Sequence, residues 1–371
     1  MKQVVVVGCG VVGAAIAYEL SQVPDLAITV LDSHSPAHAS TGAALGVLMG
    51  AISQRPKGNN LRMRLMGIQS YERWIPELER LTGQVIPFNR QGILRLCFED
   101  EDLSAWDRLI KLRQQQGWQL ELYDRTRLAQ TYPQLGLERV SGAVYSPQDR
   151  QVDPAALTLA LVAAARQRGV QFHFGSQALG IVPCPQGATS QAGNCSLRTS
   201  TAEYRCDWLV IAAGLGSREL TTTLGQPLEV RPVLGQALHI HLKSTAELPL
   251  KPVVTGNDVH IVPLGENNYW VGATVEFPVG LEIPAPTPEA LDLVWQQAVK
   301  LWPAIEQGTV VRSWSGLRPR PFGRSAPIIE FLPGHPHVLL ATGHYRNGVL
   351  LAPATAAKVR EMITPTSPSS Q

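Results

Sequence analysis

The hydrophobic positions at the start of the chain form a strand–helix–strand pattern. The uninterrupted apolar run Val4–Val7 is typical of a parallel strand that is buried on both faces. The stretch Ala14–Leu20 has the composition of a buried helix, and Ile28–Asp32 is a second apolar strand that ends in an acid. This order predicts a βαβ unit at the N-terminus.

Further helices and strands follow this unit. Asp153 precedes Pro154, and proline is a favoured first residue of a helix, so a helix is expected at 155–166. Amphipathic helices are expected at 61–82 and 101–117, buried or half-buried strands at 92–96, 170–174, 208–214 and 338–341, hairpin-like strands within 177–205, and a last helix from 349.

Between about 230 and 280 the pattern changes to an alternation of apolar and polar positions. Strands at 236–242, 258–262 and 269–275 are typical of an antiparallel sheet, and a helix is expected at 287–301. The tail 365–371 is low in complexity, and we expect it to be disordered.

These patterns predict an α/β protein of two discontinuous domains. A length of 371 residues also exceeds what one core comfortably supports. The nucleotide-binding domain is expected to combine 1–60, 140–225 and 320–364, and the substrate-binding domain to combine 61–139 and 226–319.

Composition and charge exclude several classes of protein. The 44% hydrophobic and 17% charged residues describe an ordinary folded chain, and a net charge of +2 is too balanced for a nucleic-acid-binding footprint. No uncharged apolar run approaches the roughly 20 residues of a membrane helix, and the start has no signal-peptide pattern. We therefore expect a cytoplasmic protein that binds no nucleic acid and does not span a membrane.

The cysteines give no sign of a disulfide framework or of a metal site. They form an odd, scattered set without a C-x-x-C motif, which argues against both structural disulfides and zinc. The five positions are Cys9, Cys97, Cys184, Cys195 and Cys206.

The turn after the first strand carries a dinucleotide-binding fingerprint. Gly8, Gly10 and Gly13 have the spacing G-x-G-x-x-G between a strand and a helix, and Asp32 follows about 20 residues later. We expect Gly8 to allow the tight turn, Gly10 to let a pyrophosphate approach the helix N-terminus, and Gly13 to let the helix pack on the strand. The charge of Asp32 favours a ribose hydroxyl over a 2′-phosphate, which disfavours NADP. The alternative is a glycine-rich turn followed by a chance acid.

The next segment favours FAD over NAD. The loop of small residues 40–46 follows Asp32, and its backbone can lie flat against a broad planar ligand. A flexible surface loop is the alternative, but the apolar residues Val47, Leu48 and Met49 that follow make full exposure hard to reconcile.

Five motifs together resemble the flavin-dependent D-amino-acid oxidase superfamily, and within it the glycine oxidases of the thiamine pathway. The resemblance spans nearly the whole chain and is looser at 50–150. The motifs are the fingerprint 8–13 with Asp32, the loop 40–46, and the stretches 212–217, 316–319 and 343–348; the segments 259–274 and 343–356 carry the closer likeness to glycine oxidases.

The resemblance implies a fold and a cofactor. It implies a Rossmann-like domain that holds FAD noncovalently against a substrate domain with a large antiparallel sheet. Some relatives attach flavin to a late cysteine, but no cysteine follows Cys206. The implied cofactor residues are Gly8, Gly10, Val11, Val12, Gly13, Asp32, Ser33, Ser40, Thr41, Gly42, Ala43, Ala44, Gly46, Ala178, Ala213, Gly214, Arg318, Tyr345, Arg346, Asn347, Gly348, Val349 and Leu350.

The turn at 345–350 raises a question that the resemblance answers. A charged, glycine-containing turn at the mouth of a helix can be ordinary capping. In the family the matching turn meets the pyrimidine edge of the flavin, where helix N–H groups and the positive end of the dipole stabilise the negative charge of the reduced ring.

Three side chains are candidates for the substrate site. A planar guanidinium is the best partner for a substrate carboxylate, and Arg318, expected at a strand end and held by Pro319, matches the family's carboxylate-binding arginine. A surface salt bridge is the alternative. Arg346 adjoins the flavin turn and either meets the substrate or holds the loop. His260 stands where the glycine oxidases have a tyrosine near the substrate, and a structural histidine is the alternative.

The expected function is oxidation of a small amino acid or amine, with glycine, sarcosine and D-alanine as candidates. Hydride transfer from Cα to flavin needs no protein acid or base if the amine binds neutral. The products would be an imine or keto acid, ammonia and hydrogen peroxide from molecular oxygen. The alternatives are a D-amino-acid or proline dehydrogenase that passes electrons to a carrier, and a flavin-binding protein without turnover. A homo-oligomer is left open.

Overall fold

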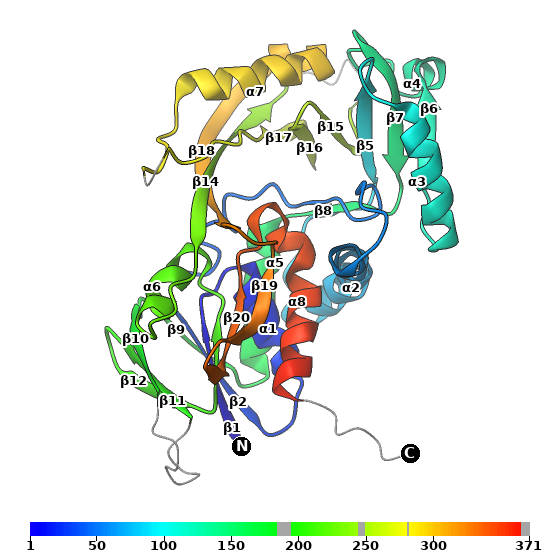
Figure 1. The fold of residues 1–371 in the computed structure, drawn as a ribbon. Helices are drawn as coiled ribbons and strands as arrows, with labels where there is room; N and C mark the ends of the chain where they lie inside the picture. The colour runs from blue at the N-terminus through cyan, green and yellow to red at the C-terminus, as the bar shows by residue number, and fades with distance from the viewer. Residues whose placement is uncertain (184–193, 244–248, 280–281, 365–371) are drawn as a thin grey trace.

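The computed structural model describes residues 1–183, 194–243, 249–279 and 282–364. The tail predicted at 365–371 and part of the predicted hairpins at 177–205 lie outside these ranges. Two large sheets, one in the lower and one in the upper half of Figure 1, organise the chain. None of the described helices combines the length and apolar character that crossing a membrane requires.

The first sheet has six strands in the order β19-β20-β13-β1-β2-β9. Four neighbouring pairs from β20 to β9 are parallel, and only β19 is antiparallel to its neighbour. This arrangement confirms the predicted βαβ start. The strands are β1 Lys2–Val7, β2 Leu26–Asp32, β9 Gln171–Phe174, β13 Trp208–Ile211, β19 Ile328–Leu332 and β20 His335–Thr342.

Both faces of this sheet are covered, which explains why its strands are apolar at consecutive positions. Val4 and Val6 pack into a core with the helices α1, α5 and α8. Val5 and Val7 point to the other face and pack into a second core with Leu197. That face is covered by a three-stranded antiparallel sheet. The elements are α1 Val11–Leu20, α5 Pro154–Gln167, α8 Gly348–Ile363, β10 Ala178–Pro183, β11 Cys195–Thr199 and β12 Glu203–Cys206.

The second sheet has eight strands in the order β18-β14-β17-β16-β15-β5-β7-β6. All of its pairs are antiparallel except β15 with β5, so the antiparallel sheet expected for 236–275 is present with one parallel junction. The strands are β5 Ile93–Phe98, β6 Glu121–Asp124, β7 Val140–Ser146, β14 Val230–His241, β15 Val253–Gly256, β16 Val259–Gly265, β17 Asn268–Gly272 and β18 Thr309–Pro321.

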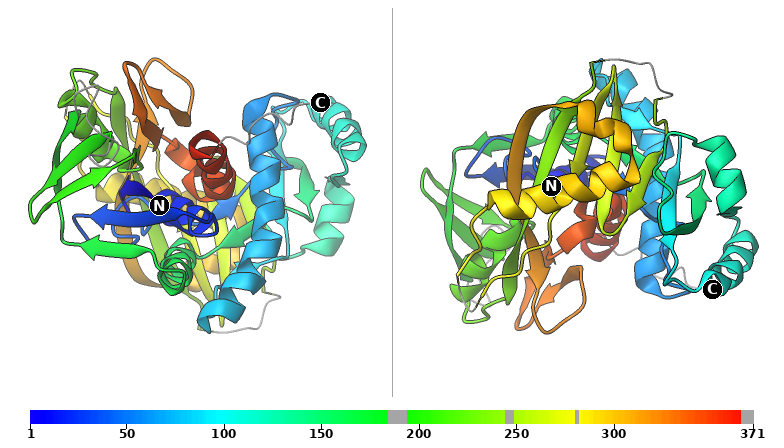
Figure 2. Two further views of the ribbon diagram at one scale, coloured as in Figure 1. Left: turned by 90° about the horizontal axis from the view of Figure 1, so that it is seen from below. Right: turned by 90° about the horizontal axis from the view of Figure 1, so that it is seen from above.

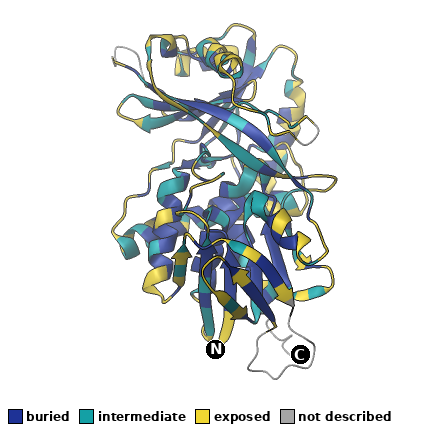
Figure 3. Ribbon diagram, turned by 90° about the vertical axis from the view of Figure 1, so that its left-hand side faces the viewer, coloured by how far each residue is buried: buried dark blue, intermediate teal, exposed yellow. Residues whose placement is uncertain are grey.

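One face of the second sheet is covered by helix α7, Pro288–Leu301, which lies across the strands in the right view of Figure 2. Leu238, Ile261 and Val271 pack there against Val294 and Leu301. The opposite face is turned toward the six-stranded sheet. Figure 3 shows that buried positions gather along the inner strands of both sheets, while exposed positions lie on outer helix surfaces, loops and edge strands.

The remaining elements connect the two sheets. Helix α2 packs against α8 and α5 at the side of the six-stranded sheet. The elements are β3 Val47–Leu48, α2 Asn59–Thr82, β4 Phe88–Asn89, α3 Leu103–Gln115, α4 Arg125–Thr131, β8 Arg150–Val152, α6 Ser217–Thr222, and the 3-10 turns η1 Gly214–Gly216, η2 Pro303–Gln307 and η3 Tyr345–Asn347.

The predicted α/β class is confirmed, but two strands do not follow the expected boundaries of the two domains. Strand β7 begins at 140, where the nucleotide-binding segment was expected to resume, yet it pairs with β5 and β6 in the eight-stranded sheet. Likewise β18 runs to Pro321, past the expected boundary at 319. The division into two folding units stays a prediction.

Candidate functional site

A cavity of about 840 Å³ lies where the end of β1, the loop 38–47, strand β18 and the start of α8 meet. It gathers segments from both ends of the chain. Its lining includes Gly8, Gly10, Val11, Val12, Asp32, Ser33, Ser40, Thr41, Gly42, Ala43, Ala44, Gly46, Ala178, Ala213, Gly214, His260, Arg318, Tyr345, Arg346, Gly348, Val349 and Leu350.

Two of the predicted cofactor residues are not in this lining. A Cβ on Gly13 would lie 1.9 Å from the carbonyl oxygen of Gly8, so Gly13 serves the close packing of α1 against the turn. Asn347 lies within the turn η3 and donates its backbone N–H to the carbonyl of His344 at 3.0 Å. Both residues contact residues that line the cavity, Gly8 and His344, without lining it themselves.

One end of the cavity is formed by the glycine turn at the N-terminus of α1. Gly8 has a φ of 102°, in the region that favours glycine, and this tight turn leads directly into α1. The Thr41 hydroxyl accepts a hydrogen bond from the backbone N–H of Val11 at 3.0 Å and so caps the helix from a distant loop. There is no acidic side chain in the first turn of α1. The helix N-terminus therefore favours an anion.

Asp32 is held rigidly at the end of β2. Its Oδ2 accepts from the backbone N–H of Cys9 at 2.6 Å, and its Oδ1 accepts from the backbone N–H of His34 at 2.9 Å. Each carboxylate oxygen retains further acceptor capacity, because it has two lone pairs. Burial, and next the charge of Asp32, raise the pKa of the Cys9 thiol to about 12, so that thiol stays protonated.

The loop of small residues bridges the two sheets. The Ser40 hydroxyl donates to the carbonyl of Leu317 at 2.6 Å, and the indole N–H of Trp314 donates to the carbonyl of Ala43 at 3.1 Å. Both partners lie on β18. The loop is therefore ordered against the second sheet, and the alternative of a flexible surface loop is wrong.

Behind this loop, two buried charged side chains hold the segment 50–55. The Asp149 carboxylate accepts from the backbone N–H groups of Gly50, Ala51 and Ile52 at 2.8, 2.8 and 2.9 Å. The Arg113 guanidinium donates to the carbonyls of Ala51, Ser53 and Arg55 at 2.8, 2.7 and 2.7 Å. Asp149 and Arg113 are both fully buried. We name these two side chains the loop clamp.

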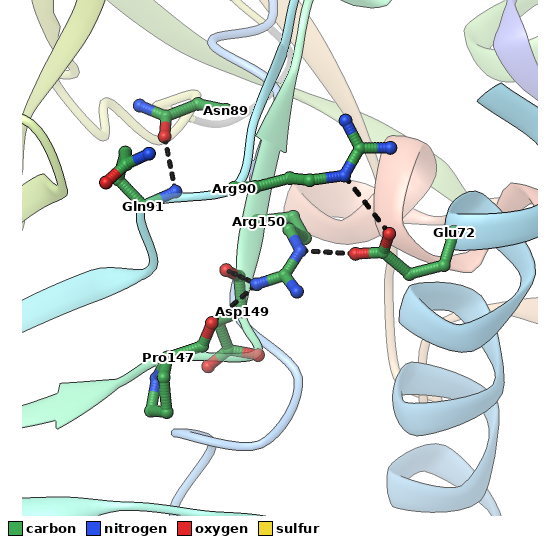
Figure 4. Close-up of polar contacts among 7 residues, drawn as sticks. All are labelled: Glu72, Asn89, Arg90, Gln91, Pro147, Asp149 and Arg150. Atoms are coloured by element: carbon green, nitrogen blue, oxygen red, sulfur yellow. Dashed lines mark hydrogen bonds and ion pairs between the residues drawn. The ribbon is translucent and has the colours of Figure 1, made fainter. Parts of the chain in front are cut away.

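The loop clamp is itself anchored to helix α2. Arg150 donates from Nε to Glu72 on α2 at 2.5 Å and from Nη1 to the carbonyls of Pro147 and Asp149 (Figure 4). Arg90 meets the other oxygen of Glu72 at 3.2 Å. These two arginines hold the pKa of Glu72 below its usual range, against the opposing effect of burial. No motif in the sequence pointed to this network.

Arg318 lies on β18 of the second sheet and lines the opposite end of the cavity. The prediction that it lies at a strand end is wrong, because β18 continues to Pro321. Strand β18 is an edge strand that pairs only with β14, and an edge strand tolerates Pro319 within it. The register places Arg318 opposite Val233.

The guanidinium of Arg318 lies across the backbone of Gly235. A Cβ on Gly235 would come within 2.3 Å of Nη2, so no other residue fits there without moving the arginine. Nη1 donates to the carbonyl of Leu234 at 2.9 Å. Burial, and next the charge of Arg346, lower the pKa of Arg318, but a guanidinium remains charged in a protein. In the described part of the chain Arg318 forms no ion pair.

Arg346 and His260 complete this end of the cavity. Arg346, in η3, forms an ion pair with the exposed Asp258 at 3.6 Å, which links the start of α8 to the β15–β16 turn. The Nδ1 atom of His260, on β16, is buried and has no hydrogen-bond partner among the described residues. Burial, and next the charge of Arg346, lower the pKa of His260 to about 4, so the ring is neutral near pH 7.

Several lining residues were missed from the sequence. A glycine inside a strand can mark a close backbone approach, and Gly235 carried that signal. The others are ordinary residues in strands or loops, and their place in the lining follows from sheet pairing alone. The missed residues include His34, His38, Gly235 and Trp314.

The donors and acceptors of the cavity fit FAD. Helix N-termini lie at both α1 and α8, the fixed acceptor Asp32 lies beside the first, and the small-residue loop lies between. This order matches a pyrophosphate, a ribose and a broad ring system that carries negative charge when reduced.

Comparisons with known proteins agree with this geometry. Residues 3–362 match the family model described as FAD dependent oxidoreductase (DAO). The bifunctional protein ThiO/ThiG of Nostoc sp. (strain PCC 7120 / SAG 25.82 / UTEX 2576) is 33% identical over 98% of this chain, and this chain spans 52% of that relative. The chain thus covers about half the length of these bifunctional relatives.

Glycine oxidases are similar over nearly their full length. The glycine oxidase of Geobacillus kaustophilus (strain HTA426) is 28% identical over 97% of this chain and 92% of its own length. The crystal structure of glycine oxidase from Geobacillus kaustophilus superposes with a TM-score of 0.87 at 26% identity, covering 100% of this chain and 96% of that one. The chain belongs to the DAO family of FAD-dependent oxidoreductases.

Proposed function

We propose that this protein is an FAD-dependent oxidase of glycine or of another small amino acid or amine such as sarcosine or D-alanine. When bound, FAD would supply the two-electron acceptor for oxidation of the substrate's C–N unit, and molecular oxygen would be reduced to hydrogen peroxide. The amino acid becomes an imine, which hydrolyses to a keto acid and ammonia. We also propose that the product of this reaction supplies thiamine biosynthesis and that the protein is cytoplasmic.

The observation that carries the proposal is the state of Arg318. Its guanidinium is partly buried, is pinned over Gly235, and forms no ion pair in the described part of the chain, although it lines the same cavity as the dinucleotide fingerprint. A partly buried cation whose only bond among the described residues is to a neutral carbonyl is incompletely compensated, and a substrate carboxylate would supply the missing negative charge. We assign Arg318 to carboxylate binding.

The proposal gives Arg346 and His260 supporting roles. The Arg346 side chain already pairs with Asp258, so we propose that it fixes the start of α8 and adds positive potential rather than gripping the substrate alone. A neutral His260 can donate or accept one hydrogen bond beside Arg318. This neutrality leaves the substrate carboxylate to the two arginines.

The protein residues act by positioning. The start of α8 would offer N–H groups to the part of the flavin that becomes negative on reduction, and the small-residue loop 40–46 would provide a wall without bulky side chains. We further propose the domain boundaries predicted from the sequence, with β7 assigned to the substrate side because of its pairing.

The decisive experiment is a visible spectrum of the purified protein, followed by anaerobic addition of glycine, sarcosine and D-alanine in turn. Bleaching by one of them supports an enzyme, and reoxidation in air with formation of hydrogen peroxide supports an oxidase. Bleaching without reoxidation would indicate the dehydrogenase, and an unchanged spectrum the binding protein. Yellow FAD should leave the protein on simple denaturation, since no late cysteine is present.

A further inference from the structure

Two cysteines that are distant from the cavity lie in contact. Cys195 on β11 and Cys206 on β12 are direct partners in the antiparallel register. Their Sγ atoms are 3.2 Å apart. A disulfide bond measures about 2.05 Å, so the two groups are thiols in contact.

The backbone around this pair already has the spacing of a disulfide. Directly opposite residues of antiparallel strands have Cα atoms about 4.5–5.5 Å apart, which falls within the roughly 4.4–6.8 Å range of disulfide-linked residues. Bond formation therefore needs only rotation of the two side chains, which brings the sulfur atoms about 1 Å closer.

The surroundings distinguish this pair from other cysteines. Both thiols of the pair are buried, and the hydrogen bond between them lowers the pKa of Cys195 against the opposing effect of burial, which favours the reactive thiolate. For Cys9 and Cys97 burial is the largest effect, and it raises the pKa of Cys9 to about 12 and that of Cys97 to about 11. Cys195 is thus the most thiolate-like of these three thiols.

We propose that Cys195 and Cys206 are a redox modification site, in which hydrogen peroxide converts the two thiols into a reversible disulfide. The Cys195 thiolate attacks hydrogen peroxide and breaks its O–O bond, and the sulfur becomes a sulfenic acid. The released hydroxide takes up the proton that the Cys195 thiol lost and leaves as water. Cys206 sulfur then attacks the sulfenic sulfur, the S–S bond forms, and a second water leaves. Two thiols lose two electrons, which reduce one peroxide to two waters.

The natural source of the oxidant rests on the proposed function, because the proposed reaction makes hydrogen peroxide within the same molecule. Neither cysteine lines the cavity, so the modification does not touch the reacting atoms. The bond would join β11 to the end of β12. There Asp207 accepts from the backbone N–H of Gln3 at 2.7 Å, so the bond would form beside an existing contact between the outer sheet and β1.

The test uses the reduced holoenzyme, freed of reductant and treated with a small excess of hydrogen peroxide without oxygen. Thiols are then alkylated in denaturant and counted, and the linked peptides are identified by mass spectrometry. We expect the count to fall from five to three, with a 195–206 linkage that dithiothreitol reverses. Cys195→Ser and Cys206→Ser should abolish the linkage, while Cys97→Ser should retain it.

Cys184→Ser is a necessary further control, because Cys184 lies outside the described residues. The linkage should form in this variant as in the parent. A count that stays at five in the parent, a bond to Cys184, or oxidation confined to other cysteines would each overturn the proposal.

A second arm replaces added peroxide by glycine in air, with and without catalase. Formation of the same linkage, suppressed by catalase, supports oxidation by the enzyme's own product. If added peroxide forms the bond but no amino-acid substrate does so, the modification site stands and the proposed oxidase function fails.

Discussion

The Tyr71 hydroxyl on α2 donates a hydrogen bond to the carbonyl oxygen of Val349 in the first turn of α8. Pro353 lies four residues after Val349 and has no N–H, so this carbonyl has no donor within its own helix. Tyr71 is fully buried and supplies the missing donor. A side chain of one helix thereby completes the backbone bonding of another, at the turn that lines the cavity.

Tyr71→Phe should destabilise the protein, because it leaves a buried carbonyl without a partner. We expect a loss of about 1–3 kcal/mol in the free energy of unfolding, measured by urea denaturation. Tyr145→Phe is the matched control, since the Tyr145 hydroxyl donates at 3.0 Å to the carbonyl of Gln91 near the surface. Equal losses in the two variants would mean that the buried carbonyl finds another donor.

Asp32→Ala should weaken FAD binding about 10- to 100-fold, which corresponds to the roughly 1.5–3 kcal/mol of a hydrogen bond to a charged group. The measurement is flavin fluorescence during titration of the apoprotein. Because Asp32 also holds the backbone N–H groups of Cys9 and His34, unfolding of the apoprotein must be measured alongside. Asp107→Ala, at an exposed position on α3, is the control. Unchanged affinity in a folded variant would remove Asp32 from the cofactor site.

Arg318→Lys should lower kcat/KM for glycine-like substrates by a factor on the order of 100, because lysine keeps the charge but loses the planar fork. FAD content should not change. Amines without a carboxylate should be affected far less, which separates a carboxylate site from general damage. Arg324→Lys serves as control, since Arg324 is exposed and paired with Glu330. Full activity of Arg318→Lys would make Arg346 the next residue to test.

Asp149→Asn should loosen the segment that the loop clamp holds. An asparagine can accept from two of the three backbone N–H groups, but its amide would face the N–H of Ile52 donor to donor. We expect a loss of about 1–3 kcal/mol in unfolding free energy together with a shifted flavin absorption band. Asp102→Asn, an exposed helix cap where asparagine is equally suitable, should change neither. A stable variant with an unchanged spectrum would show that the loop does not depend on Asp149.

Stability should fall as the pH drops from about 6.5 toward 4, in part because of His344. Burial lowers the pKa of His344 from 6.5 to about 4, so in this window the unfolded chain binds a proton that the folded chain does not. The stability that neutral, buried His344 contributes to the folded state is fully present above pH 6.5 and is lost as the pH falls toward 4. His344→Gln should reduce this pH-dependent loss of unfolding free energy by about 3 kcal/mol. Denaturation curves at several pH values test it, with exposed His34→Gln as control, and an unchanged slope would contradict it.

Part of this architecture could be predicted because the signals are local. The strand–turn–helix at 2–20 has its glycines and apolar residues next to one another, and both faces of β1 are buried, which requires an uninterrupted apolar run. The segments of the cavity lining were likewise identified, because the fingerprint, the small-residue loop and the turn before α8 are each contiguous.

Only the tertiary structure decided how distant segments meet. The sequence indicates that Arg318 belongs to a strand, but only the register of β18 with β14 places Gly235 beneath its guanidinium. Asp149 and the N–H groups of 50–52 are about 100 residues apart, and no local pattern connects a carboxylate to a loop so far away.

The cysteines show the same limit most directly. Their spacing argued against a disulfide framework, yet the pairing of β11 with β12 brings Cys195 and Cys206 into contact. Periodicity determines which face of a strand is buried, because side chains alternate along it. It does not determine which residue of the neighbouring strand lies opposite, because that register depends on turns, bulges and packing across the whole sheet.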